Sequence, residues 1–180
     1  EVERAEAHQR LGEAWEALGG QERDDISLQL ARHFREAGTF SKAVDYLRQA
    51  GEGAKRTGAY KECTGAWREA LRLVESLPGS PSRDRMEIDL LLDLCHEWWG
   101  EFLEPEEMER YLARAHALAT RLEDRAHLFS ALLAAFVRSH FLGEQDRCRT
   151  YLDQAEPWVA DSIDAEEAFL FRHYRALNSL

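Results

Sequence analysis

The chain has 180 residues, of which 44% are hydrophobic and 32% charged, and its formal net charge is -11. This composition excludes intrinsic disorder and collagen-like structure, because apolar residues are plentiful enough for a core while glycine and proline are few. The acidic balance also argues against direct binding of nucleic acid, whose phosphate backbone requires basic residues.

Apolar residues recur with the 3.6-residue period of an α-helix along almost the whole chain, and no stretch shows the two-residue alternation of a strand. This pattern predicts an all-α fold. The expected helices, about nine in number, cover residues 3–18, 24–37, 41–57, 59–77, 83–103, 105–121, 125–142, 144–157 and 164–179.

Residues that stop or start helices support these bounds. Gly38 and Gly58 stand where a helix is expected to end in a left-handed turn. Ser80 before Pro81 is typical of an N-cap followed by the first helical residue. Helices 83–103 and 125–142 carry apolar residues over more than one stripe, so we expect neighbours to cover them on more than one side.

A short pattern occurs near residue 40, near residue 60 and again, more weakly, near residue 145. It consists of a glycine, an aromatic, a small residue, a large apolar residue and an alanine. The copies are Gly38, Phe40, Ala43, Leu47 and Ala50; Gly58, Tyr60, Cys63, Trp67 and Ala70; and Gly143, Cys148, Leu152 and Ala155. We expect the glycine to form a tight turn, the aromatic to fill the helix junction, and the small residue to allow close helix approach. The large residue and the alanine are expected to fill the seam between units.

Leu30, Ala31 and Phe34 stand where the first helix of a tetratricopeptide unit places its large, small and aromatic residues. From about residue 24 onward, the chain therefore resembles tetratricopeptide-like (TPR-like) helical repeats. The resemblance implies a right-handed α-solenoid of helix hairpins. The spacing of the copies departs from the steady period of about 34 residues that such repeats have.

The runs 8–18, 30–38, 43–52 and 60–63 resemble, in addition, the segment after the ATPase module of large bacterial signalling proteins. These are STAND-type ATPases linked to class III nucleotide cyclase domains or to LuxR-type DNA-binding domains, including MalT-like activators. Their ATPase, cyclase and DNA-binding residues lie outside this segment, so the resemblance carries over no catalytic residue.

We therefore expect the chain to be a fragment of a longer protein and to form one repeat domain over residues 1–180. Within it, residues 1–23 form a leading helix and 24–77 the best-matching repeats. Residues 78–82 form a loop, and 83–180 form more divergent repeats.

No motif of catalysis, metal binding or cofactor binding is found in the sequence. Gly51 and Gly53 lack the preceding strand and the lysine of a phosphate-binding loop, and we expect them to serve close helix packing. His96 is followed at the fourth position by Gly100 rather than by the histidine of a zinc-protease motif. The sequence predicts a protein that is not an enzyme and that uses no metal and no cofactor.

Cys63, Cys95 and Cys148 are far apart in the sequence and each lies in an expected helix. Three unpaired thiols favour core packing and a reducing, cytoplasmic location. The longest apolar run without a charge is about half of the ~20 residues that a membrane span needs, so no membrane association is expected.

Two groups of residues are candidates for binding. Trp98 and Trp99 are adjacent on an expected helix and point about 100° apart, so one can be packed while the other faces a groove. Basic residues of consecutive helices could line a concave surface that receives carboxylates, the alternative being that they pair with Glu36, Asp45 and Glu52. These basic residues are Arg32, Arg35, Arg48, Lys55 and Arg56.

The leading hypothesis is a non-catalytic module that binds a protein, a peptide or another domain of the same chain within a bacterial signalling or transcription regulator. The alternative is a domain that senses a small-molecule inducer, as the MalT-like resemblance implies. In that case aromatic residues such as Trp67, Trp98, Trp99 or Phe141 would stack on the ligand. The sequence leaves the partner, the oligomeric state and the flanking domains open.

Overall fold

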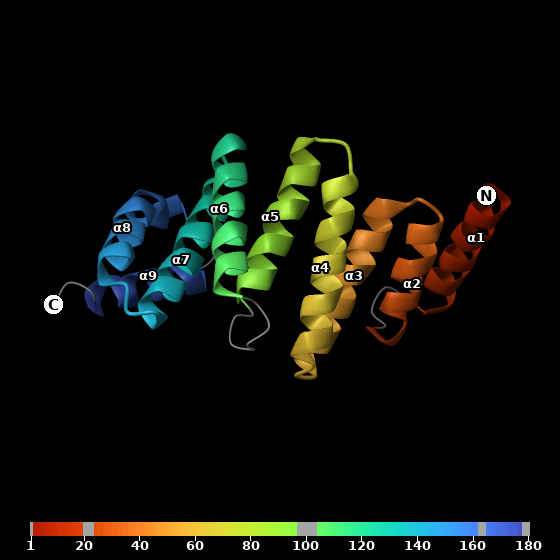
Figure 1. Ribbon diagram of the computed structural model, residues 1–180, viewed down its shortest axis with the longest axis horizontal. Coiled ribbons are helices and arrows are strands. Elements are labelled where there is room, and N and C mark those ends of the chain that lie inside the picture. Colours follow the sequence, from red (N-terminus) through yellow and green to blue (C-terminus); the bar gives the residue numbers. More distant parts are fainter. Residues whose placement is uncertain (1, 20–23, 97–103, 162–164, 178–180) are drawn as a thin grey trace. The chain divides into compact units, whose positions relative to one another are not determined.

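The computed structural model describes residues 2–19, 24–96, 104–161 and 165–177. These residues form nine α-helices and one 3₁₀ helix, with no strand among them (Figure 1). The all-α class and the number of helices predicted from the sequence are therefore confirmed. The handedness of a solenoid stays a prediction.

The helices match the expected ranges to within two residues at most ends. They are α1 (Val2–Gly19), α2 (Asp24–Glu36), α3 (Phe40–Arg56), α4 (Tyr60–Ser76), α5 (Pro81–His96), α6 (Pro105–Arg121), α7 (Arg125–Phe141), α8 (Gln145–Ala155), the 3₁₀ helix η2 (Glu156–Asp161) and α9 (Ala165–Leu177). The helix expected over 83–103 is described as far as His96, and the rest of that range lies outside the described residues.

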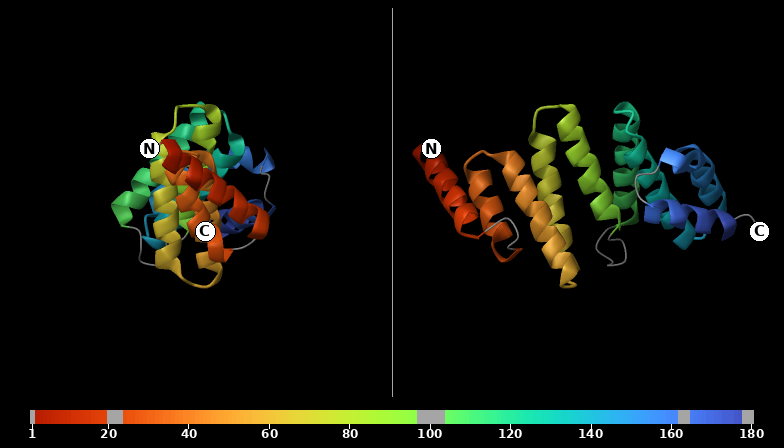
Figure 2. Two further views of the ribbon diagram at one scale, coloured as in Figure 1. Left: turned by 90° about the vertical axis from the view of Figure 1, so that its right-hand side faces the viewer. Right: turned by 180° about the vertical axis from the view of Figure 1, so that it is seen from behind.

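The chain forms two compact units, whose boundary falls within α5. Unit 1 contains the described residues up to Leu90, and unit 2 contains those from Leu91 onward. In unit 1, the helices α1, α2, α3 and α4 pack each against the next in the sequence, an order that is also visible from behind (Figure 2). In unit 2, α7 packs between α6 and α8, and η2 and α9 also contact α7. Packing between consecutive helices is the pattern that stacked hairpins require.

One turn geometry connects consecutive helices at four places. After α2, the Thr39 amide donates to the Phe34 carbonyl (2.8 Å) and the Gly38 amide to the Arg35 carbonyl (3.0 Å). Equivalent pairs of hydrogen bonds follow α3, α6 and α7. This is the Schellman motif, which satisfies carbonyls at the helix end and requires one residue of positive φ.

Glycine supplies the positive φ in three of these turns, with values of 78° at Gly38, 75° at Gly58 and 73° at Gly143. The glycines of the repeat pattern are thus confirmed as turn residues. The turn after α6 has Glu123 in this position instead, at a φ of 53°. The sequence did not reveal that turn as a copy of the others, because it contains no glycine.

The small and large positions of the repeat are buried between consecutive helices, as expected. The small residues Ala43, Cys63 and Cys148 are 0% exposed, and the large residues Leu47, Trp67 and Leu152 are at most 3% exposed. The three alanines of the pattern, Ala50, Ala70 and Ala155, and the upstream Leu30, Ala31 and Phe34 are buried as well.

The aromatic position has a different role from the one expected. Phe40 and Tyr60 are the first residues of α3 and α4, and they are 37% and 41% exposed. The prediction that this aromatic fills the helix junction is therefore wrong. Side chains of a helix tilt toward its N-terminus, so the side chain of a first residue extends past the helix end, where fewer neighbours cover it.

Trp67 and Gly51 fix the approach of α3 and α4. The indole of Trp67 is fully buried, and its Nε1–H donates to the Arg48 carbonyl (3.3 Å). A Cβ atom at Gly51 would lie 2.1 Å from that Nε1, closer than non-bonded atoms can approach. The expectation that Gly51 serves close helix packing is confirmed.

Three further expectations concern two helix ends and the coverage of the apolar arcs. The Ser80 hydroxyl accepts a hydrogen bond from the Arg83 amide (3.1 Å), so the predicted N-cap before Pro81 is confirmed. The helix expected over 144–157 instead ends at Ala155 and continues as η2, because Pro157 has no N–H for an α-helical hydrogen bond. The wide apolar arcs are buried as predicted, with residues 131–136 of α7 all at 9% exposure or less.

Replacing Gly51 with Ala should destabilise the protein by about 1–3 kcal/mol, because the added methyl group overlaps a buried indole that cannot move freely. The matched control is Gly65→Ala. Gly65 lies inside α4, and a Cβ atom there meets nothing within 4 Å. That change should stabilise by about 0.5–1 kcal/mol through lower backbone entropy of the unfolded chain. Urea unfolding of the two variants measures both effects, and equal signs would contradict the packing role.

Replacing Glu123 with Gly should stabilise the protein by about 1 kcal/mol, because glycine adopts a positive φ without the steric cost that a side chain imposes. The reverse change in the equivalent turn, Gly143→Ala, should destabilise by about 1–2 kcal/mol. Thermal unfolding followed by circular dichroism checks both. A loss of stability in Glu123→Gly would show that the glutamate side chain makes a contribution larger than the turn strain.

Candidate functional site

The most promising candidate site is a cavity of about 350 Å³ in unit 2, which crosses the three consecutive helices α6, α7 and α8. Apolar side chains form much of its lining: Leu112 and Ala113 from α6 and Ala131, Leu132 and Ala135 from α7. The polar lining residues are Glu109, His116, Arg138, Arg147, Tyr151 and Gln154. The cavity therefore combines an apolar lining with charged groups from all three helices.

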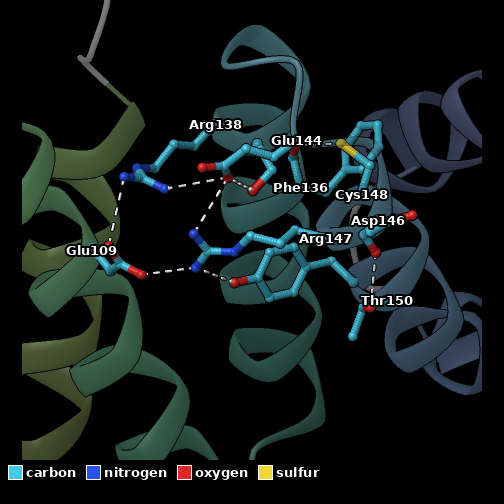
Figure 3. A network of polar contacts seen from close by, with 10 residues as sticks. Glu109, Phe136, Arg138, Glu144, Asp146, Arg147, Cys148 and Thr150 are labelled. Carbon is cyan, nitrogen blue, oxygen red and sulfur yellow. Dashed lines mark hydrogen bonds and ion pairs between the residues drawn. The ribbon is translucent and has the colours of Figure 1, made fainter.

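Arg147 on α8 is the centre of the polar contacts (Figure 3). Its Nη2 donates to Oε1 of Glu109 on α6 (2.8 Å) and to the hydroxyl of Tyr151 (3.2 Å), while its Nη1 donates to Oε2 of Glu144 (3.4 Å). The Glu144 carboxylate also accepts from the hydroxyl of Ser139 (3.0 Å). Arg147 thus connects α6 with α8 by charge-assisted hydrogen bonds.

Arg138 on α7 is more deeply placed, with a side chain only 10% exposed. Among the described residues it forms ion pairs with Oε2 of Glu109, at 3.8 Å from Nη2, and with Oε2 of Glu144, at 3.9 Å from Nη1. Both distances exceed the limit of a hydrogen bond. Within the described ranges, no acceptor atom forms a hydrogen bond with this guanidinium group.

The charged groups of the cavity are better suited to hold a charged ligand than to transfer a proton. The hydrogen bond and charge of Arg147, together with the charge of Arg138, lower the pKa of Glu109, so this carboxyl is ionised at neutral pH. The same hydrogen bond to Glu109 raises the pKa of Arg147. A carboxyl with a lowered pKa is a poor general acid, and an arginine remains charged.

The thiols near the cavity are not activated. Burial raises the pKa of Cys95 to about 12, and burial also raises the pKa of Cys148, with the charge of Glu144 adding to the effect. The Cys148 sulfur lies 4.0 Å from the Phe136 carbonyl in the core of unit 2. A protonated, buried thiol packs as a small apolar group and does not act as a nucleophile.

The basic residues predicted to bind a partner lie in unit 1, on α2 and α3. Arg35 pairs with Glu69 and, at 3.7 Å, with Glu36, while Arg48 pairs with Asp89 at 3.3 Å. For Arg35 and Arg48 the structure therefore has ion pairs, as the alternative interpretation held, although Glu69 and Asp89 were not among the expected partners.

The other residues predicted to bind a partner are three basic residues and two tryptophans. The Lys55 ammonium group lies 5.9 Å from the ring centroid of Trp67, and Arg32 and Arg56 are exposed. Trp98 and Trp99 lie outside the described residues. A role of any of these residues in binding stays a prediction.

Sequence reasoning missed the cavity residues Arg138 and Arg147. One signal was present: Arg138 follows Ala131 and Ala135 at helical spacings of seven and three residues, so a charged residue lies on the buried side of an otherwise apolar helix. Arg147 carries no such signal, since an arginine in the first turns of a polar helix is ordinary.

A second hollow, of about 360 Å³, lies in unit 1 between α1 and α3 and is lined by Glu16, Lys42, Asp45, Tyr46 and Gln49. Its main polar groups satisfy one another. The Glu16 carboxylate accepts from the Lys42 ammonium group (2.8 Å) and from the Tyr46 hydroxyl (2.7 Å). This hollow is therefore less suited to a ligand than the cavity in unit 2.

Cys95 and Cys148 should react with a disulfide reagent such as DTNB at pH 8 at least about tenfold more slowly than a free cysteine, because burial keeps both thiols protonated and inaccessible. After denaturation in guanidinium chloride, all three cysteines should react at the rate of the free amino acid. A native chain in which Cys95 or Cys148 is modified at the rate of the free amino acid would contradict the assignment of these residues to the core.

The described part of the chain contains neither a helix suited to span a membrane nor a group of side chains suited to hold a metal ion. No helix in it combines the length and the apolar character that a membrane crossing requires. No group of three histidine, cysteine or acidic side chains in it is arranged to hold a metal ion. A scan against protein-family models finds no match to the chain, and a search of curated proteins finds no similar sequence.

Proposed function

We propose that the chain is a non-catalytic interaction module and that the cavity across α6, α7 and α8 binds a segment of another protein or of another domain of a longer chain. The observation that carries this proposal is the combination of an apolar lining with a partly exposed arginine–glutamate network in one cavity. Interfaces are built in this way, with an apolar centre and polar groups that orient the partner.

The chemistry of the cavity supports a binding role. Glu109 is held as a carboxylate, and the nearby thiols are held in their protonated form. Groups stabilised in these states attract or orient a ligand but offer neither an acid nor a nucleophile to a reaction.

The biological setting is proposed from the resemblance of the sequence to the segment after the ATPase module of STAND-type regulators. In that setting, TPR-like helix hairpins receive or transmit a signal in a cytoplasmic, multidomain regulator of bacterial signalling or transcription. Stacked hairpins suit this task, because they offer an extended surface to another domain.

The second candidate function, sensing of a small-molecule inducer, is favoured by the size of the cavity. A volume of about 350 Å³ is within the range of small-molecule sites. Binding of a metabolite would raise the melting temperature of the chain. A thermal-shift screen with metabolites therefore tests this function directly.

Peptides selected from a random phage-displayed library on the immobilised chain should lose at least about tenfold in affinity when Ala113 is replaced by Trp, since the indole would occupy cavity volume. Ala113 is exposed, so the change should leave the fold intact. Isothermal titration with the selected peptides measures the loss.

The matched control is Ala117→Trp. Ala117 is exposed on the same helix and is not among the residues that line the cavity. Peptides that bind both variants as tightly as the wild type would place the interaction elsewhere. Hydrolase or cyclase activity of the chain itself would contradict the non-catalytic part of the proposal.

A further inference from the structure

We infer that the cavity in unit 2 recognises a single carboxylate joined to a short apolar body, with Arg138 as the anion-binding residue and Glu109 as the group that the ligand replaces. This inference rests on the proposed function, since it names the chemistry that the cavity would select. It assigns to Arg138 a role beyond its two long ion pairs with Glu109 and Glu144.

Arg138 is a buried charge without hydrogen bonds to the described residues. Its five N–H groups can serve several acceptors, yet the carboxylate oxygens of Glu109 and Glu144 with which it pairs lie 3.8 and 3.9 Å away. Burying a charged group is unfavourable unless hydrogen bonds compensate for the lost water. A guanidinium group that is 10% exposed and lines a cavity is therefore prepared for an acceptor that enters the cavity.

The position of Glu109 indicates where such an acceptor would lie. Figure 3 shows its carboxylate joined by dashed lines to the guanidinium groups of Arg138 and Arg147, which come from two other helices. Glu109 is half exposed, at 51%, so its carboxylate can turn into solvent. An ion pair that is this exposed adds little to stability, and a ligand carboxylate can replace it at small cost.

Charge balance favours one negative charge on the ligand. In the network, Arg138 and Arg147 face Glu109 and Glu144. When Glu109 turns away, a monoanion restores two positive and two negative charges around the site. A carboxylate also matches the planar fork of a guanidinium group, which can bind both of its oxygens.

The apolar part of the cavity explains the second half of the ligand. Ala131 and Ala135 lie on the same face of α7 as Arg138, and Leu112 and Leu132 complete the apolar wall. The two alanines leave space next to the charged group, so a short aliphatic chain attached to the carboxylate would be covered. The same chemistry occurs in an acidic side chain next to an apolar one in a peptide, and in a free organic acid.

The test uses two matched pairs of probes and two-dimensional NMR of the ¹⁵N-labelled chain. One pair is N-acetyl-Glu-Leu-amide and N-acetyl-Gln-Leu-amide, and the other is hexanoate and hexanamide. Each acid should bind at the cavity, and each neutral partner should bind roughly tenfold more weakly or not at all, because the charge-assisted hydrogen bonds are lost. Binding of only the peptide acid identifies the peptide source, and binding of only hexanoate identifies the free acid.

Three variants separate ligand binding from a structural role. Arg138→Met should weaken the acids roughly tenfold or more, and Arg138→Lys should also weaken them because the planar fork is lost. Glu109→Gln should strengthen binding, because it removes the competing carboxylate. The melting temperature of free Arg138→Met should equal or exceed that of the wild type, whereas a structural arginine would lower it.

The inference is overturned if the neutral probes bind as well as the acids, if neither acid binds wild type or Glu109→Gln, or if Arg138→Met binds without loss. Should Arg138→Met fail to fold, the other two variants decide. The inference is then overturned if Arg138→Lys binds the acids without loss or if Glu109→Gln does not bind them more tightly. Failure of the proposed function gives a different result. The selected peptides would then bind Ala113→Trp with the same affinity as the wild type. Peptides that are sensitive to Ala113→Trp but not to Arg138→Met would keep the proposed function and reject the carboxylate.

Discussion

The turn after α2, α3, α6 and α7 is the constraint on which the packing within each unit depends. One residue of positive φ and two backbone hydrogen bonds return the chain beside the helix that it has just left. Each helix is then covered first by its neighbours in the sequence. Those neighbours lie on two sides, so a helix such as α7 needs apolar residues around most of its surface.

Where two helices meet, the size of one side chain is matched by its partner. Gly51 leaves the space that the Trp67 indole fills, and the two residues together allow α3 and α4 to approach closely. In unit 2, the small residues Ala131 and Ala135 line a cavity instead. A small residue on a buried helix face therefore allows close packing at Gly51 and leaves a cavity at Ala131 and Ala135.

The sequence predicted those features that depend on one residue or on a regular spacing. Gly38, Gly58 and Gly143 identified their turns because a left-handed turn favours glycine, and the buried seam followed from the spacing of small and large residues. The turn at Glu123 could not be recognised, since backbone hydrogen bonds impose it against the preference of the residue.

The candidate site was harder to predict than the fold, because its contacts join residues far apart in the sequence. Arg147 and Glu109 are separated by 38 positions, and no local pattern relates them. The exposed rings of Phe40 and Tyr60 illustrate the same limit, since a spacing predicts which residues share a helix face but not how far a neighbouring helix covers a side chain at the helix end.

Arg138 differs from its neighbours on α7, because it is a charged residue that follows an apolar, buried part of the helix. Residues 131–136 of the same helix are all buried and apolar, and each agrees with the packing of α7 between its neighbours. In unit 1, the polar hollow shows how a charge in such a place is normally treated, since Lys42 and Glu16 are joined by a hydrogen bond of 2.8 Å. Arg138 lies farther than this from both of its carboxylates. A charged residue on a buried helix face, with ion pairs this long, is expected where binding, rather than stability, determines the side chain. At Arg138 a ligand carboxylate would therefore add the hydrogen bonds that Glu109 and Glu144, at 3.8 and 3.9 Å, do not form.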